Sequence, residues 1–91
     1  MQIIGRVVKV TDVQFDYDEA IDGWWEKFNL IIKNPANCMY AFEVFGKEKE
    51  VSAIAALPPN ALVEVNYFIS CWEEENKWCT RLKAETVRRL S

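Results

Sequence analysis

Histidine is absent from this 91-residue chain, and glycine, proline and cysteine each occur only three times. Without histidine, a cysteine or serine nucleophile lacks its usual general base, and no serine stands in the Gly-x-Ser-x-Gly turn of hydrolases. The carboxylates gather in short acidic stretches rather than forming an isolated pair. We therefore expect a protein that is not an enzyme.

Metal-ligand motifs are also missing. Cys38, Cys71 and Cys79 form no Cys-x-x-Cys pair and have no histidine to join them. The acidic stretch from Asp16 to Asp22 lacks the spacing, the glycine and the terminal glutamate of a calcium loop. We expect no metal and no cofactor. An odd number of cysteines also argues against a disulfide framework and favours three free thiols in a reducing, cytoplasmic setting.

Long apolar runs are absent as well. No stretch approaches the roughly 18 apolar residues of a membrane-spanning helix, and we expect no contact with a membrane. The N-terminus, residues 1–6, shows no basic region followed by an apolar run, so we expect no signal peptide. A chain of this length supports one hydrophobic core, which predicts a single domain over residues 1–91.

The formal charge of −3 is unevenly distributed. Seven of the 14 acidic residues lie in two short stretches, residues 16–22 and 73–75. The remaining seven face 11 lysines and arginines, so the rest of the chain carries a net charge of +4. If the acidic stretches are loops, the strands carry a modest positive excess, which is compatible with a nucleic-acid ligand.

Hydrophobic periodicity predicts five strands and one helix. Alternating apolar residues favour strands, and an apolar stripe of helical spacing favours one helix between the third and fourth of them. The acidic stretch over residues 15–23 is expected to be a loop. The predicted elements are strands over 3–13, 24–33, 38–45, 62–72 and 78–87, with the helix over 47–57. This order is typical of the OB-fold, an all-β five-stranded Greek-key barrel with one short helix between strands three and four. An SH3-like barrel is the main competing fold.

Two local features refine this prediction. Gly5 suggests a bulge or a bend in the first strand, and Gly46 is expected to end the third. A last hairpin symmetric about Glu75 would place Trp72 opposite Trp78 and Cys71 opposite Cys79. Apolar side chains alternate along three strands. Tyr40, Phe42 and Val44 are expected to point inward, Phe28, Leu30 and Ile32 to share one face of their strand, and Val63, Val65, Tyr67 and Ile69 to lie on one side of theirs.

Several motifs resemble those of bacterial single-stranded DNA-binding proteins. The strand ending in Phe45-Gly46-Lys47, the helix after it and the aromatic-threonine start of the last strand keep that family's spacing. Over nearly its whole length the chain also resembles a family of small bacterial proteins of unknown function related to those binders, whose Gly-Arg-Trp-Tyr-Thr-Asp run appears loosely as residues 76–81. The resemblance implies an OB-fold that binds single-stranded DNA.

OB barrels bind ligands across strands two and three and the two flanking loops. Single-strand binding requires aromatic rings on which bases stack and cations that meet the backbone. The candidate nucleic-acid-binding residues that combine these properties are Trp25, Lys27, Asn29, Lys33, Phe45, Trp72, Lys77 and Trp78.

Two functions fit this pattern. The first is non-catalytic binding of single-stranded DNA, with RNA left open, by stacking and phosphate contacts. The second is a protein-interaction or self-assembly module that uses the same exposed aromatic face. In both cases we expect a homodimer or homotetramer, because so many aromatic rings in so small a domain favour burial between subunits.

Overall fold

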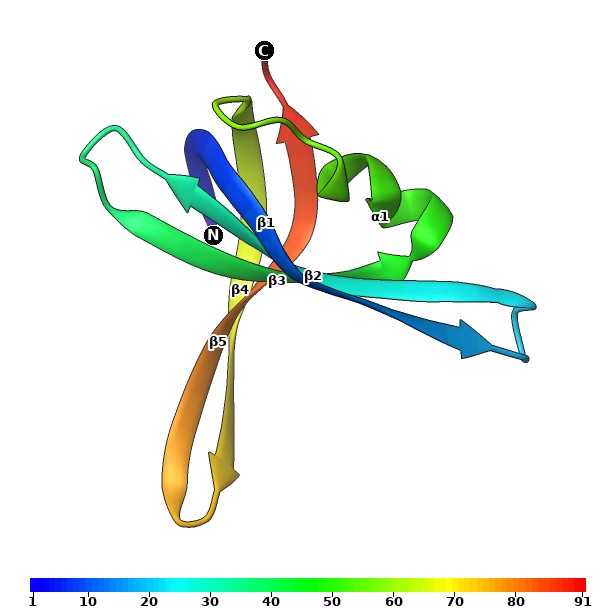
Figure 1. Ribbon diagram of the computed structural model, residues 1–91. Helices are drawn as coiled ribbons and strands as arrows, with labels where there is room; N and C mark the ends of the chain where they lie inside the picture. The colour runs from blue at the N-terminus through cyan, green and yellow to red at the C-terminus, as the bar shows by residue number, and fades with distance from the viewer.

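The computed structural model describes residues 1–91, which form a closed five-stranded barrel with one helix. In chain order the elements are β1 (Gln2–Asp18), β2 (Gly23–Lys33), β3 (Met39–Lys47), α1 (Glu48–Ala55), β4 (Leu62–Glu74) and β5 (Lys77–Arg89). The strands neighbour one another in the order β1-β2-β3-β5-β4, and β4 pairs with β1 to close the barrel (Figure 1). Only β3 and β5 pair in parallel. This is the OB-fold, and the predicted fold class is confirmed.

Alternate strand positions supply the core. Phe28, Leu30 and Ile32 share one face of β2 as predicted, and that face is buried; Tyr40 is half-buried. Ile69 lies farther along β4 than Val63 and Val65 and is 50% exposed, because the strand has left the barrel there. The core cluster consists of Val7, Phe28, Leu30, Ile32, Phe42, Val44, Val51, Ala61, Val63 and Val65.

β1 bends, and it can therefore pair with both β4 and β2 and close the barrel. Its first residues pair with β4 and the others with β2, with register shifts between Val7 and Lys9 and between Thr11 and Gln14. Such bulges curve a strand and increase its twist. Gly5 does not lie at either bulge. It allows the backbone of β1 to approach β2 closely, because a Cβ there would lie 2.6 Å from the carbonyl oxygen of Lys33.

Helix α1 packs against β2 and β3 and places Val51 in the core. It covers Glu48–Ala55 rather than the predicted 47–57. A Cβ on Gly46 would lie 2.9 Å from Cγ1 of Val51, so the glycine allows the helix to approach β3. β3 continues to Lys47, and the prediction that it ends at Gly46 is wrong. No helix has the length and apolar character needed to cross a membrane.

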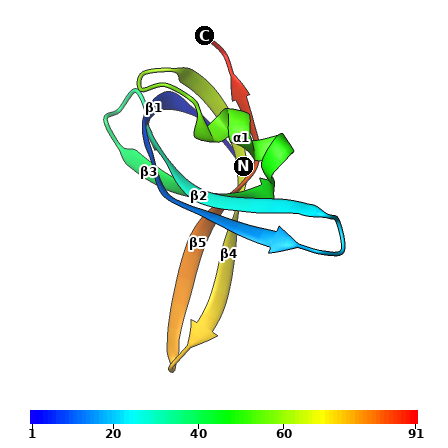
Figure 2. The same cartoon turned by 45° about the vertical axis from the view of Figure 1, so that its right-hand side comes forward.

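Two hairpins project from the barrel as arms, which diverge from each other and point away from the C-terminus (Figures 1 and 2). We call them the β1–β2 arm (residues 14–27) and the β4–β5 arm (residues 69–81). They account for a radius of gyration of 13.9 Å, where a compact domain of this length has about 12 Å.

The β1–β2 arm replaces the acidic loop predicted over residues 15–23. β1 continues to Asp18, β2 begins at Gly23, and Tyr17 pairs with Trp24. Residues 15–18 alternate aromatic and acidic side chains, Phe-Asp-Tyr-Asp. This is a two-residue strand period, and the acidic composition masked it.

The predicted register of the β4–β5 arm is wrong by one residue. Glu75 and Asn76 both have left-handed φ angles, 49° and 64°, as in a two-residue type I′ turn. The hairpin is therefore centred between them, so that Trp72 pairs with Cys79 and Glu73 with Trp78. Paired residues of an antiparallel ladder share a face, so the two tryptophans lie on opposite faces. Cys71 and Cys79 are likewise on opposite faces, and all three cysteines are free.

Candidate nucleic-acid interface

The outer face of β2 and β3 carries the middle of the candidate site. The ladder pairs Trp25 with Lys47, Lys27 with Phe45 and Asn29 with Glu43. Two adjoining hollows of about 350 Å³ and about 300 Å³ run along this face and share Gln14 and Lys27. We call them together the trough. Its lining residues are Asp12, Gln14, Phe15, Asp16, Trp25, Lys27, Phe28, Asn29, Phe45 and Arg81.

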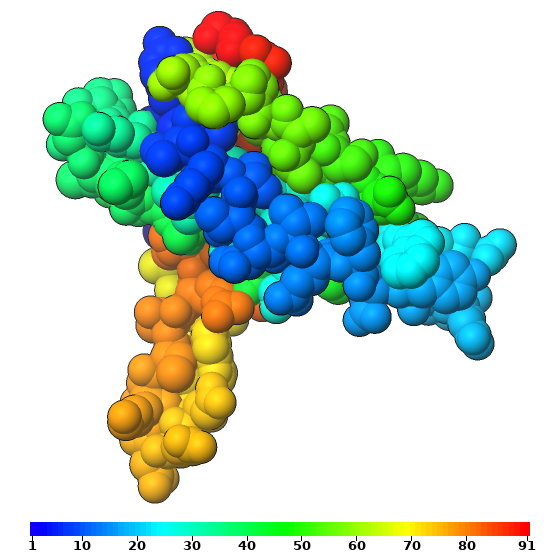
Figure 3. All heavy atoms as spheres, viewed as in Figure 1, coloured from blue at the N-terminus to red at the C-terminus, as the bar shows by residue number.

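The trough draws on both arms, because Gln14 and Lys27 belong to the β1–β2 arm and Arg81 to the β4–β5 arm. The space-filling view shows how widely the two arms open away from the barrel (Figure 3). An extended chain lying against the barrel can therefore contact both arms.

Trp25 and Phe45 form a stacked pair at one end of the trough. Their ring centroids are 5.0 Å apart and the ring planes differ by 5°. The Trp25 indole N–H donates to Asp18 Oδ2 at 2.8 Å. Trp25 is half-buried, whereas Phe45 is 59% exposed. The ring offered to a ligand is thus mainly Phe45, with Trp25 fixed behind it.

Asp18 is ionised in this arrangement. The hydrogen bond from Trp25 lowers the pKa of its carboxyl, and a second one from the Ala20 backbone N–H lowers it further. Both donors favour the charged form of the acid. The same bond fixes the orientation of the Trp25 ring.

Glu43 lies under three cations in the middle of the face. Arg81 Nη1 donates to Glu43 Oε2, and the Nζ atoms of Lys27 and Lys83 each lie 3.9 Å from Glu43 Oε1. We call these four residues the Glu43 cluster. Glu43 stands opposite Lys83 because β3 and β5 pair in parallel there.

Trp72 extends the Glu43 cluster along the β4–β5 arm. The Arg81 guanidinium lies over its ring, 5.6 Å from the centroid, in a cation–π contact. The Trp72 indole N–H donates to Glu74 Oε2 at 3.3 Å. Trp72 is thus placed on the face that carries Arg81 and Lys83.

The structure does not bring the other two predicted residues of this arm to the trough. Trp78 is 74% exposed, but it lies on the opposite face of the hairpin from Trp72. Lys77 stands at the far end of the arm, next to the turn.

Asn29 has a structural partner within the trough. Its side-chain amide donates to Asp12 Oδ2 at 3.0 Å. Asp12 has a φ of 56° and occupies the second register shift of β1. Asn29 therefore tethers the bulge from which the β1–β2 arm extends.

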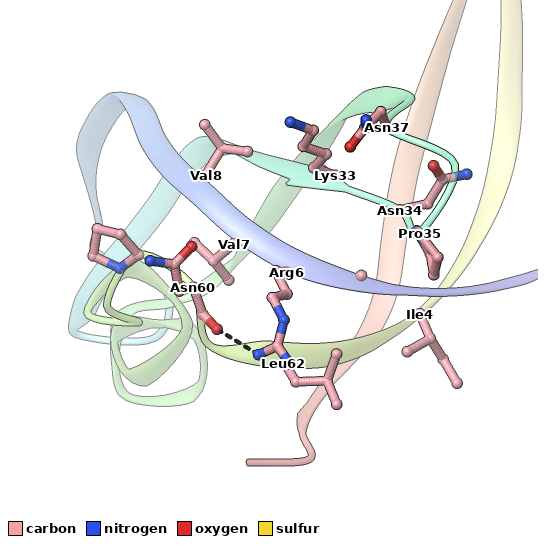
Figure 4. A pocket seen from close by; sticks show the side chains of 12 residues that line it. Ile4, Arg6, Val7, Val8, Lys33, Asn34, Pro35, Asn37, Asn60 and Leu62 are labelled. Atoms are coloured by element: carbon pink, nitrogen blue, oxygen red, sulfur yellow. Dashed lines mark hydrogen bonds between the residues drawn. The ribbon is translucent and has the colours of Figure 1, made fainter.

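Lys33 lies away from the trough. It is eight positions along β2 from Trp25, roughly 26 Å at the rise of a strand. It borders a separate groove of about 580 Å³ between β1, the β2–β3 turn and the segment after α1 (Figure 4). There the Arg6 guanidinium donates to the carbonyl oxygen of Asn60 at 3.0 Å, and the Lys33 side chain points away from it (Figure 4).

Sequence reasoning missed two cations and one aromatic residue. Arg81 and Lys83 reach the site through the parallel pairing of β5 with β3, and Phe68 is exposed beside Lys83 on β4. The alternation of Arg81 and Lys83 was visible in the sequence. The strand that would lie beside them was not.

The opposite face of the β1–β2 arm is aromatic. Tyr17 and Trp24 are exposed there, and their rings meet edge to face at 5.4 Å. The Tyr17 hydroxyl donates to Asp22, and this bond raises the pKa of the phenol above its ordinary value, with smaller effects of burial and of Asp18.

The barrel has the same fold as several solved OB-fold structures. The chain is similar to the mitochondrial single-stranded DNA-binding protein Rim1 of S. cerevisiae, with 17% identity and a TM-score of 0.61 over 99% of this chain and 92% of that one. It is also similar to a small single-stranded DNA-binding protein of Streptomyces coelicolor, with 15% identity and a TM-score of 0.59 over 98% and 91%.

A third similar structure is the dimeric N-terminal domain of the PriB protein of Thermoanaerobacter tencongensis. It has 10% identity and a TM-score of 0.54 over 100% of this chain and 94% of that one. No family model matches the chain, and no curated protein matches it in sequence. At these identities the similarity establishes the fold, as the sequence resemblance predicted.

Proposed function

We propose that this protein binds single-stranded DNA without catalysis, and that the strand lies in the trough between the two arms. One observation carries the proposal: an exposed Phe45 ring, supported by Trp25, shares one face with Lys27, Arg81 and Lys83. Aromatic stacking is worth about 1–3 kcal/mol per base and tolerates any sequence. Cations beside the ring would meet the phosphates. Two of the similar structures are single-stranded DNA-binding proteins, which favours DNA over RNA as the ligand.

The charges of the trough predict weak binding that depends modestly on salt. Asp12 and Asp16 line it and repel phosphate, so we expect micromolar affinity. Lys27, Arg81 and Lys83 carry three positive charges, and Glu43 neutralises one of them. The two phosphates that the remaining charge can neutralise give a log–log salt slope of about −1.4, at about −0.7 per contact on a single strand.

Fluorescence anisotropy of a labelled oligothymidylate strand at several salt concentrations tests this proposal. Phe45→Ala should weaken binding by about 1–3 kcal/mol, the value of one stacked base. Trp78→Ala is the matched control, because it removes an exposed aromatic ring from outside the trough and should leave the affinity unchanged. Absence of binding at low salt, or an equal loss in both variants, would refute the proposal.

A protein-interaction or self-assembly module is the second candidate. The observation that favours it is the exposed pair of Tyr17 and Trp24, on the face of the β1–β2 arm opposite the trough. Burial of this face between copies would give the homodimer or homotetramer expected from the sequence. Light scattering tests this candidate. A particle of 10.6 kDa at high concentration would be a monomer and would contradict self-assembly.

A further inference from the structure

The Glu43 cluster holds more positive charge than its one carboxylate can neutralise. Three cations and one anion leave a net charge of +2. The other ion pair of the barrel joins one cation to one largely buried carboxylate, Arg88 to Glu64 at 3.1 Å. The excess is thus particular to the face that carries the trough.

Burial within the cluster is uneven. The side chain of Glu43 is 9% exposed, whereas those of Lys27, Arg81 and Lys83 are 44%, 46% and 38% exposed. The carboxylate therefore lies beneath, and the cations face solvent. Lysine and arginine carry several N–H donors each, so donors remain for a second anion on the solvent side.

The position of the cluster suggests which anion this is. Lys27 lines both hollows of the trough, beside Phe45 in one and beside Arg81 in the other. A chain with a base on Phe45 would bring its phosphates over these cations. Arginine and lysine are the usual protein partners of phosphate, and arginine can bind it through two N–H groups.

We propose that Lys27, Arg81 and Lys83 form the phosphate-binding site of this face, and that Glu43 is an internal counter-ion with which phosphate competes. The carboxylate holds the three cations in place and, by its own charge, keeps their affinity for phosphate low. The inference rests on the proposed function for its natural ligand, but the anion site itself can be tested without DNA.

Glu43→Gln is the decisive variant, because glutamine keeps the size and an acceptor for Arg81 while removing the charge. We expect it to bind oligothymidylate about fivefold to tenfold more tightly, as removal of one like charge near 4 Å implies at high dielectric. The salt slope should become steeper by about 0.7. Glu64→Gln is the control: it changes the net charge equally, breaks an ion pair as well, and should leave both values unchanged.

Tripolyphosphate serves as a second probe, with binding followed by calorimetry. If no variant binds oligothymidylate but Glu43→Gln binds tripolyphosphate more tightly than wild type and Glu64→Gln do, the proposed function fails and the phosphate site stands. Equal tightening in both variants would be an effect of overall charge and would overturn the inference. Unchanged or weaker binding by Glu43→Gln would also overturn it.

Variants of the cations keep the inference testable if Glu43→Gln does not fold. Arg81→Gln and Lys83→Gln should each weaken tripolyphosphate binding, whereas Arg88→Gln, on the far pair, should not. Equal effects of all three substitutions would contradict a site at the Glu43 cluster.

Discussion

Glu26 lies at the base of the β1–β2 arm and should destabilise the folded protein at neutral pH. The residue is only 3% exposed, and its Oε2 atom receives no hydrogen bond from the protein. It pairs with Phe15 on one side and Gly46 on the other. Burial raises the pKa of its carboxyl above the ordinary 4.5, and the negative charge of Glu48 adds to the effect.

A buried polar group without a partner costs about 1–3 kcal/mol, and more when it is charged. Glu26→Met keeps the length of the side chain and removes the polar oxygens. We therefore expect it to raise the free energy of unfolding by about 1–3 kcal/mol at neutral pH. For a domain of this size, each kcal/mol corresponds to about 4–8 °C in Tm.

The pH dependence follows from the direction of the pKa shift. Because the folded-state pKa of Glu26 lies above its unfolded value, the fold favours the protonated acid. The resulting contribution to stability is complete below about pH 4.5 and is lost as the pH rises through the folded-state pKa. Wild type should therefore lose stability relative to Glu26→Gln over that interval.

Urea unfolding between about pH 4 and about pH 8 measures both effects. Glu85→Gln, which removes the same charge from an exposed site on β5, is the control and should follow the wild-type curve. The reasoning is refuted if Glu26→Gln also follows the wild-type curve, or if Glu26→Met is less stable than wild type at neutral pH.

Two further predictions concern the parts that position the trough. Gly46→Ala places a Cβ 2.9 Å from Val51, so it should cost about 1–3 kcal/mol by displacing α1 from β3; urea unfolding measures the loss, and unchanged stability would contradict close helix contact. The hydrogen bond between Trp25 and Asp18 should contribute stability above the ordinary Asp18 pKa of 3.8 and lose it as the pH falls through the lowered folded-state pKa. The NMR signal of the Trp25 indole proton should shift in that acid range, and Asp18→Asn should abolish the shift.

The barrel could be predicted from the sequence because its signals are local. Phe28, Leu30 and Ile32 occupy alternate positions of one strand, and Val51 and Ile54 repeat at helical spacing. These periods specify strand, helix and buried face directly. The order of the elements then limits the topology to few folds.

The site was only partly predictable, because it depends on pairing between distant strands. The parallel contact of β3 with β5 brings Arg81 and Lys83 to Glu43, and no local pattern indicates that contact. A single turn type decided the register of Trp72 and Trp78, since a two-residue turn moves every partner by one position. Lys33 shares the outer face with Trp25, but a strand is long enough to separate two residues on one face.

The proposal that the trough binds single-stranded DNA is tested most directly by a two-dimensional NMR titration of the ¹⁵N-labelled protein with oligothymidylate at low salt. The account predicts that the shifts concentrate on the backbone amides of Lys27, Phe45 and Arg81 and on the indole of Trp25, and that they diminish as salt is added. Shifts confined to the face of Tyr17 and Trp24, or no shifts at all, would contradict it.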